Sequence, residues 1–311
     1  MNEEFNLAAV VIWYKPETIG IEKILENINS YGPQVGKIYI VDNSPQENHE
    51  YFSRLSNSVY IYNNNKGGIA GATNLGVKQA QEDGFNWIMT VDQDSMFASG
   101  EFEKYLSLVE EYSRQDKTAV SFGPHINNLN EKKYITKQFR YKVLSPIKRK
   151  IYSVIRKNWK PAVLPEVEIN KNLIASANIV KTSVLEEVNY YDEKLFIDQV
   201  DYDLCSRIRN KGYRTVRLNK VSLDQIYGES KFKFFIRPKS VYSQFRLYYI
   251  VRNHLIMMSR YEYIRPLFQK ELREFYWQYC VFSTKALKNR KVFKKAYADA
   301  ASFIENEKES K

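Results

Sequence analysis

Cysteine, histidine and long apolar runs are all scarce in this sequence of 311 residues. Its two cysteines, Cys205 and Cys280, cannot form a disulfide framework and match no metal-ligand spacing, which favours a reducing, cytoplasmic compartment. The first thirty residues have neither a basic segment nor a long apolar one, so we expect no signal peptide. No stretch of about 18 uncharged apolar residues occurs, and we therefore expect no membrane-spanning helix.

The few histidines also restrict the chemistry. None of His49, His125 and His254 adjoins a GxSxG turn or a cysteine pair, and no HExxH occurs. These absences argue against a serine or cysteine hydrolase.

Positive charge is what the chain has in excess, with a formal net charge of +11. Residues 231–298 hold sixteen Lys and Arg against three Asp and Glu, interleaved with Tyr and Phe. Such a region suits an anionic membrane surface, but it can equally face solvent, pack on a catalytic domain or form a homodimer contact. Without a recognisable RNA- or DNA-binding motif, we expect no nucleic-acid partner.

Strand and helix patterns alternate in the first half, which predicts an α/β fold with a mostly parallel sheet and helices on both faces. The predicted strands are 7–13, 37–41, 58–62, 85–91 and 172–180. Thr18 is the expected N-cap of a helix reaching Ile28. Residues 131–160, with eleven Lys and Arg and one Glu, read as a basic insertion over the sheet edge. From about residue 231 the pattern is helical, which divides the chain into a catalytic domain (1–230) and a helical, basic C-terminal region (231–311).

Three polar clusters follow predicted strands: Asp42, residues 63–71 and Asp92-Gln93-Asp94. Ligands of such sheets bind at the carboxyl ends of the strands, so the clusters should share one rim. Asp92 and Asp94 suit a hard cation such as Mg²⁺ or Mn²⁺, which would neutralise a departing diphosphate. A solvated turn is the alternative reading of this common tripeptide.

The glycine-rich segment 66–71 (KGGIAG) is expected to begin a helix whose free amides face a ligand. It is neither a P-loop, since no GKS or GKT follows, nor a GxGxxG motif. A plain glycine-rich turn is the alternative. Asn74 and Gly76, one turn later, would pack against the same rim.

A second group of acids is Asp198, Asp201 and Asp203. One of them can act as a general base toward a substrate hydroxyl. Acids at a helix N-terminus also interact favourably with the helix dipole, so a capping role is compatible with the same residues.

The order of these motifs resembles family 2 glycosyltransferases, the inverting enzymes of the GT-A nucleotide-diphospho-sugar transferase fold, and their rhamnosyltransferase and galactofuranosyltransferase-like branch in particular. The matching stretches run from about residue 7 to residue 260: VVIWYKP, KIYIVDNS, NNNKGGIAGATNLGV, WIMTVDQDS, the block from NLIASANIV to NKGYR, and FRLYYIVRNHLIM.

The resemblance implies a role for each matching residue. Asp201 corresponds to the catalytic base, with Asp198 as second choice; Asp94 and Asp92 correspond to the metal-binding acids. The residues implied in donor binding are Asp42, Asn64, Lys66, Gly71, Asp92, Arg246 and Arg252, with Asn253 in the same arginine-containing helix. One departure stands out: Gln225 occupies the place of a family histidine, and its neighbour Asp224 is a candidate metal ligand in that histidine's stead.

The implied activity is inverting transfer of a sugar from a nucleoside-diphosphate donor, with Mn²⁺ or Mg²⁺ as cofactor. The donor would be dTDP-rhamnose, UDP-galactofuranose or another UDP-hexose. The acceptor would be a growing bacterial surface polysaccharide on a polyprenyl diphosphate, and the protein would be cytoplasmic and peripheral on the inner face of the cell membrane. The alternatives are an inactive transferase-fold protein in polysaccharide assembly and a basic nucleic-acid-binding protein.

Overall fold

The computed structural model describes residues 5–52, 54–129, 164–225, 230–231, 239–240 and 242–309, so the predicted insertion 131–160 lies outside the described residues. Within these residues, nine strands form one sheet in the order β3-β2-β1-β4-β8-β6-β9-β5, with β7 paired to β9. Their bounds are β1 Leu7–Trp13, β2 Lys37–Asp42, β3 Ser58–Tyr62, β4 Trp87–Asp92, β5 Ser95–Phe97, β6 Ala119–Asn128, β7 Val167–Ile169, β8 Asn178–Lys181 and β9 Arg214–Gln225. A separate pair joins β10 Ser230–Lys231 to β11 Lys239–Ser240.

The first four strands are parallel, and their carboxyl ends are level with one another. Asp42 pairs in register with Trp13 and with Tyr62, and Asp92 pairs with Ile12. The next strand, β8, runs antiparallel to both β4 and β6, which makes the sheet mixed. The four parallel strands confirm the parallel sheet that the strand–helix alternation predicts for the first half of the chain, and the antiparallel pairings of β8 make the whole sheet mixed.

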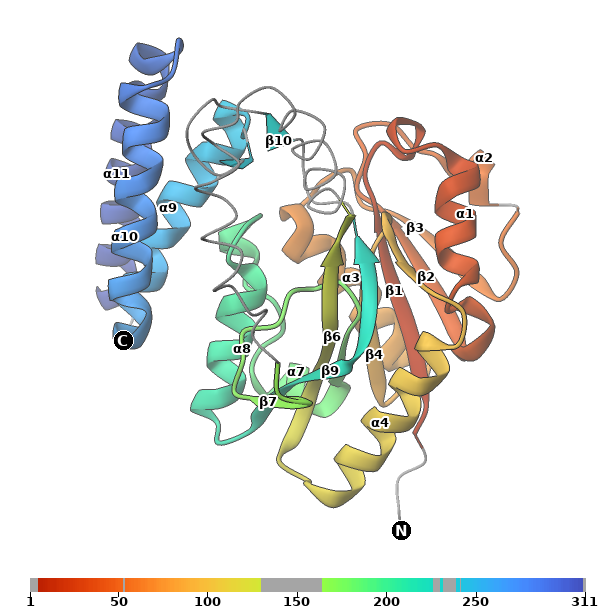
Figure 1. Cartoon of the computed structure of the whole chain (residues 1–311). Coiled ribbons are helices and arrows are strands. Elements are labelled where there is room, and N and C mark those ends of the chain that lie inside the picture. Colours follow the sequence, from red (N-terminus) through yellow and green to blue (C-terminus); the bar gives the residue numbers. More distant parts are fainter. Residues whose placement is uncertain are drawn as a thin grey trace, which may run out of the picture.

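Helices cover both faces of this sheet, as Figure 1 shows. On one face lie α1 Ile21–Asn29 and α4 Glu101–Gln115; on the other lie α3 Gly68–Glu82, α7 Thr182–Glu187 and α8 Val200–Asn210. The alternation along β1 explains both layers, because Ala9 and Val11 join the core under α1 and α4 whereas Ala8 and Val10 join the core under α3. The short helical elements are η1 Pro16–Thr18, η2 Gly32–Gln34, α2 His49–Phe52 and η4 Glu193–Leu195.

Two local predictions are wrong. Thr18 ends the 3₁₀ turn η1, where its hydroxyl donates to the carbonyl of Lys15, and the N-cap of α1 is Gly20. The strand predicted over 172–180 begins only at Asn178, because Ala177 adopts a left-handed backbone (φ 58°) that interrupts the extended chain.

The C-terminal helices form a bundle beside the sheet (Figure 1), and the helical C-terminal region is confirmed within the described residues. They are α9 Gln244–Arg260, η5 Glu262–Ile264, α10 Arg265–Phe275, the π-helical η6 Tyr276–Val281 and α11 Ala286–Glu309. Ile256 and Ala300 reach into the core under α3, so the bundle packs on the sheet domain. The domain boundary at residue 230 stays a prediction. Among the described helices, none is both long enough and apolar enough to span a bilayer.

Candidate active site

The Asp92-Gln93-Asp94 triplet lies at the rim, between the end of β4 and the start of β5. The side chain of Gln93 fixes it there: its Oε1 accepts from the Tyr14 amide and its Nε2 donates to the Tyr14 carbonyl, both at 3.0 Å. The triplet is therefore attached to the end of β1 by a pairing that resembles a strand ladder.

The two acids of the triplet share one partner, Gln225, the last residue of β9. Its Nε2 donates to Asp92 Oδ2 at 2.8 Å and lies 3.4 Å from Asp94 Oδ1. Gln225 is only 5% exposed, and its Oε1 is buried without a hydrogen-bond partner. Burial and the nearby Asp92 charge raise the pKa of Asp94 to about 6. Asp224 comes one residue earlier in the strand, so its side chain points to the opposite face from Gln225.

These residues fit a hard divalent cation. Two carboxylates and an amide oxygen are ligands that Mn²⁺ and Mg²⁺ accept, and rotating the Gln225 amide by half a turn would present Oε1 to the carboxylates. Among the described residues, no group of three His, Cys, Asp or Glu side chains has a metal-binding arrangement.

Asp201, near the start of α8, faces the same rim. Its Oδ2 accepts from the Ala175 amide at 3.1 Å, and the next residue, Ser176, donates to Asp92 Oδ2 at 2.5 Å. Two consecutive residues thus connect the two acids. Burial, together with the charges of Asp92 and Asp198, raises the pKa of Asp201 to about 7, although the Ala175 hydrogen bond opposes this shift. A carboxyl group with this pKa can exchange a proton near neutral pH.

Asp198 lies in a tight turn ahead of α8, where both it and Gln199 have positive φ (61° and 67°). Its carboxylate forms an ion pair with Arg246 of α9. Asn253, also on α9, is fully buried and donates to the carbonyls of Leu195, Ile197 and Asp198 at 2.8–2.9 Å. Helix α9 therefore holds the turn that precedes the Asp201 helix.

Arg252 serves the same turn from α9. It donates to the carbonyls of Lys194 and Leu195 (2.6 and 3.2 Å), and its guanidinium lies 4.9 Å from the centre of the Tyr249 ring. In this arrangement Arg252 supports the loop backbone.

Asp42 is fully buried at the end of β2, and its carboxylate accepts four hydrogen bonds. Ser44 N reaches Oδ1, while Asn48 N, Asn48 Nδ2 and Tyr60 Oη reach Oδ2, at 2.6–3.0 Å. Four bonds match the acceptor capacity of a carboxylate, so Asp42 orders the 43–48 turn.

The glycine-rich segment packs against protein. The amide of Ile69 donates to the Phe196 carbonyl at 2.9 Å, and a Cβ on Gly68 would lie 2.3 Å from the same oxygen. Gly71 is needed because a Cβ there would lie 2.4 Å from the Lys66 carbonyl oxygen. The expectation that these helix-start amides are free for a ligand is therefore wrong for Ile69. Asn64 (φ 49°) and the side chain of Lys66 are exposed in the preceding turn.

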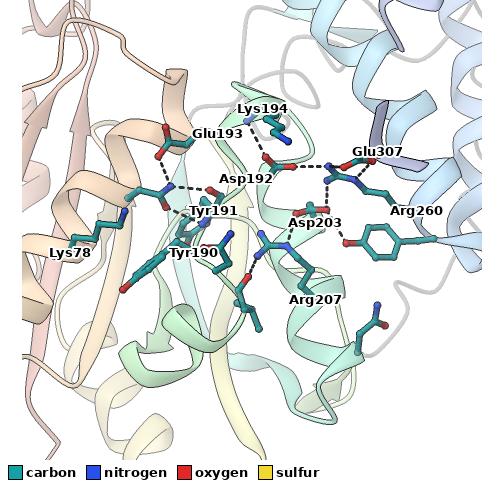
Figure 2. A pocket seen from close by; sticks show the side chains of 15 residues that line it. Lys78, Tyr190, Tyr191, Asp192, Glu193, Lys194, Asp203, Arg207, Arg260 and Glu307 are labelled. Carbon is teal, nitrogen blue, oxygen red and sulfur yellow. Dashed lines mark hydrogen bonds and ion pairs between the residues drawn. The ribbon is translucent and has the colours of Figure 1, made fainter. Parts of the chain in front are cut away.

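The third acid of the group, Asp203, is separate from the rim. It is fully buried and accepts from Arg207, Arg260 and Tyr261 at 2.8–2.9 Å. Figure 2 shows this cluster beside a pocket of about 620 Å³ that Asp92 and Asp201 do not line.

Sequence reasoning missed Ser176, which connects Asp92 to the Asp201 side of the site. Asp92 and Ser176 are 84 residues apart, and the only available signal was the small, polar ASAN stretch after Ile174.

Comparison with known proteins finds a matching family and a similar protein. Residues 17–175 match the family described as Glycosyl transferase family 2. The chain is 26% identical over 264 residues to the dTDP-rhamnosyl transferase RfbF of Shigella flexneri, covering 82% of this chain and 80% of that protein.

Two solved structures share the fold. S. aureus TarS 1-349 in complex with UDP-GlcNAc matches with a TM-score of 0.53 and 14% identity, covering 95% of this chain and 80% of that one. GalNAc-T7 with UDP, GalNAc and Mn²⁺ matches with a TM-score of 0.51 and 11% identity, covering 73% of this chain but only 45% of that one. The GT-A fold predicted from the sequence is confirmed.

Proposed function

Because the chain belongs to glycosyl transferase family 2, we propose that this glycosyltransferase inverts the configuration of the sugar that it takes from its nucleotide-sugar donor. The observation that carries the proposal is the link through Ala175 and Ser176, which joins Asp201 to Asp92 on one rim of the sheet. Asp201, the proposed proton acceptor, and Asp92, the acid proposed to lie near the donor diphosphate, are thereby held next to each other.

Asp201 is the general base in this proposal. A hydroxyl of the acceptor sugar attacks the anomeric carbon of the donor, and its proton passes to the Asp201 carboxylate as the new glycosidic bond forms. The bond from the anomeric carbon to the diphosphate oxygen breaks on the opposite face, and the nucleoside diphosphate leaves with the bonding electron pair. A single displacement of this kind inverts the anomeric centre.

Asp94 and Asp92 would hold Mn²⁺ or Mg²⁺, joined by the amide oxygen of Gln225. Asp224, the ligand that the sequence nominates, points to the other face of β9 and is not part of this set. When bound, the cation neutralises the charge of the departing diphosphate. Asn64, Lys66 and Arg246 are the exposed members of the proposed donor-binding set. Asp42, Gly71 and Arg252 would serve it by holding the backbone of the surrounding turns in place.

We place dTDP-rhamnose first among the donors, ahead of UDP-galactofuranose and other UDP-hexoses. The name of the RfbF relative supports dTDP-rhamnose, and the UDP-GlcNAc in the TarS complex supports a uridine donor. The acceptor we propose is a bacterial surface polysaccharide growing on a polyprenyl diphosphate. The enzyme would then act in the cytoplasm, peripherally on the inner face of the cell membrane.

A donor panel tests the proposal. Release of nucleoside diphosphate is measured for dTDP-rhamnose, UDP-galactofuranose and UDP-glucose, with the metal removed by chelation and then restored as Mn²⁺. We expect one donor to dominate, chelation to abolish its turnover and Asp201→Asn to be inactive. Asp116→Asn, on the surface beside Arg214, is the matched control and should keep full activity. Full turnover by Asp201→Asn would contradict the base assignment, and activity that survives chelation would contradict the metal assignment.

A further inference from the structure

Five large apolar side chains are exposed together where η6 passes into α11: Tyr276, Trp277, Val281, Phe282 and Leu287, here called the apolar tip. Their exposed fractions reach 56% for Trp277, 67% for Phe282 and 75% for Leu287. The Trp277 and Phe282 rings stack on each other with centroids 5.9 Å apart, so these two rings form one continuous surface. Apolar surface gathered in this way normally marks a binding site.

The apolar tip lies in a basic part of the sequence. Between residues 272 and 298 the chain has seven Lys and Arg and one Glu. Lys285, Lys288 and Lys291 are exposed within or next to the tip. Aromatic side chains ringed by lysine match the headgroup region of a bilayer that contains anionic lipid. An apolar protein partner would not require this excess of positive charge.

The apolar tip lies at the same end of the molecule as the catalytic rim. The start of α9 is held next to it, since Tyr279 Oη accepts from the Tyr242 amide at 2.8 Å and Gln244 Nε2 donates to Asn289 Oδ1 at 3.3 Å. Two residues after Gln244, Arg246 binds Asp198. In Figure 1 the start of α11 and the carboxyl ends of β6 and β9 lie toward the same end of the molecule.

We propose that the apolar tip inserts into the headgroup region of an anionic bilayer and thereby turns the catalytic rim toward the membrane. The binding itself follows from the apolar and basic side chains of the tip. That this orientation brings the catalytic rim to its acceptor rests on the proposed function, in which the acceptor sugar is attached to a polyprenyl diphosphate at the membrane surface. No helix has to cross the bilayer for this contact.

Sedimentation of the full chain with vesicles tests the proposal. The vesicles are phosphatidylcholine alone or an equimolar mixture of phosphatidylcholine and phosphatidylglycerol. We expect the protein to bind the mixed vesicles preferentially and the triple variant Trp277→Ser/Phe282→Ser/Leu287→Ser to bind them more than about tenfold more weakly. Leu267→Ser is the matched control, since Leu267 is 51% exposed near the opposite end of α10. A second variant, Lys285→Gln/Lys288→Gln/Lys291→Gln, should lose the preference for the mixed vesicles.

Unchanged binding by the triple apolar variant overturns the proposal, and so does a wild-type protein that binds neither vesicle. A wild-type dimer that the triple variant converts to monomer, without vesicle binding, assigns the tip to self-association instead. Nucleoside diphosphate release is measured on the same samples without vesicles. Vesicle binding without turnover on any donor would contradict only the proposed function, and turnover without vesicle binding would contradict only the membrane contact.

Discussion

The guanidinium of Arg246 binds the carboxylate of Asp198 through three contacts: Nη2 lies 2.9 Å from Oδ1, and Nε lies 3.2 Å from each carboxylate oxygen. Asp198 therefore has a cationic partner, whereas the only hydrogen bond described for the Asp201 carboxylate comes from the Ala175 amide. Both carboxylate oxygens of Asp198 are thus already engaged by arginine, whereas Asp201 keeps an oxygen for which no hydrogen bond is described. Of the two acids that the sequence nominates as base, the geometry favours Asp201.

Replacing each acid by its amide should separate the two roles. We expect Asp201→Asn to lower kcat at least about a hundredfold, since it removes the proton acceptor. Asp198→Asn should instead act mainly on KM, because the Arg246 contact that orders the turn is weakened. Steady-state kinetics on the preferred donor measure both values. Equal losses of kcat in the two variants would contradict this division.

The pH dependence of turnover should report Asp201. Its pKa is about 7, so the carboxyl group is increasingly protonated below neutral pH. In that form it cannot take the proton from the hydroxyl of the acceptor sugar. We expect kcat/KM to rise from acid pH and to level off above about pH 7. A rate that is flat between pH 5 and 8 would be incompatible with this base.

Stability should move with pH in the opposite direction. Because the folded pKa of Asp201 is raised, the folded state favours the protonated form. Its stabilising contribution is complete below the ordinary Asp pKa of about 3.9 and is lost as the pH rises through about 7. Asp201→Asn, which stays neutral, should therefore unfold at a higher urea concentration than wild type at pH 8 and at a similar one at pH 4.

Gln225 should control the affinity for Mn²⁺. Titration of the donor-free protein, followed by electron paramagnetic resonance of free Mn²⁺, measures this without turnover. Gln225→His should bind Mn²⁺ roughly tenfold more tightly and Gln225→Leu roughly tenfold more weakly. Asp224→Asn is the control, and we expect it to change little because its side chain faces the other side of β9. A larger loss in Asp224→Asn than in Gln225→Leu would reassign the third ligand.

The buried network around Arg260 should dominate the stability of the bundle contact. Arg260 binds Asp192, Asp203 and Glu307 at 2.5–2.8 Å and is 14% exposed. Arg260→Met should lower the free energy of unfolding by about 3 kcal/mol, because it leaves buried charge without a partner. Arg114→Met, which breaks an exposed pair with Glu110, should cost less than about 1 kcal/mol. Urea denaturation compares the two.

Local patterns predicted the elements whose formation depends mainly on their own residues. The four parallel strands follow apolar, β-branched runs, and the rim residues follow from where those strands end. The predicted helix start at Thr18 is wrong because a 3₁₀ turn that begins with Pro16 ends at this residue, and Gly20 is the N-cap of the helix.

Contacts across the fold could not be predicted in this way. In the segment before β8, where Ala177 interrupts the extended chain, Ala175 and Ser176 bond to Asp201 and Asp92. The partners of Ala175 and Ser176 lie 26 and 84 residues away in the sequence, and only the folded sheet brings them together. The same holds for Gln225. Its position in a family motif made it a candidate site residue, but its contacts with Asp92 and Asp94 did not follow from the sequence.

The three hydrogen bonds of Asn253 have a consequence for any attempt to recombine this enzyme with a relative. They join α9 to the backbone of residues 195–198, just ahead of the helix that carries Asp201. A chimera cut between the sheet domain and the C-terminal bundle would take Asn253 from one parent and the carbonyls that it binds from the other. Exchange of residues 192–203 together with α9 would keep the amide and its carbonyls in one inherited unit. The C-terminal helices are in this sense part of the catalytic scaffold.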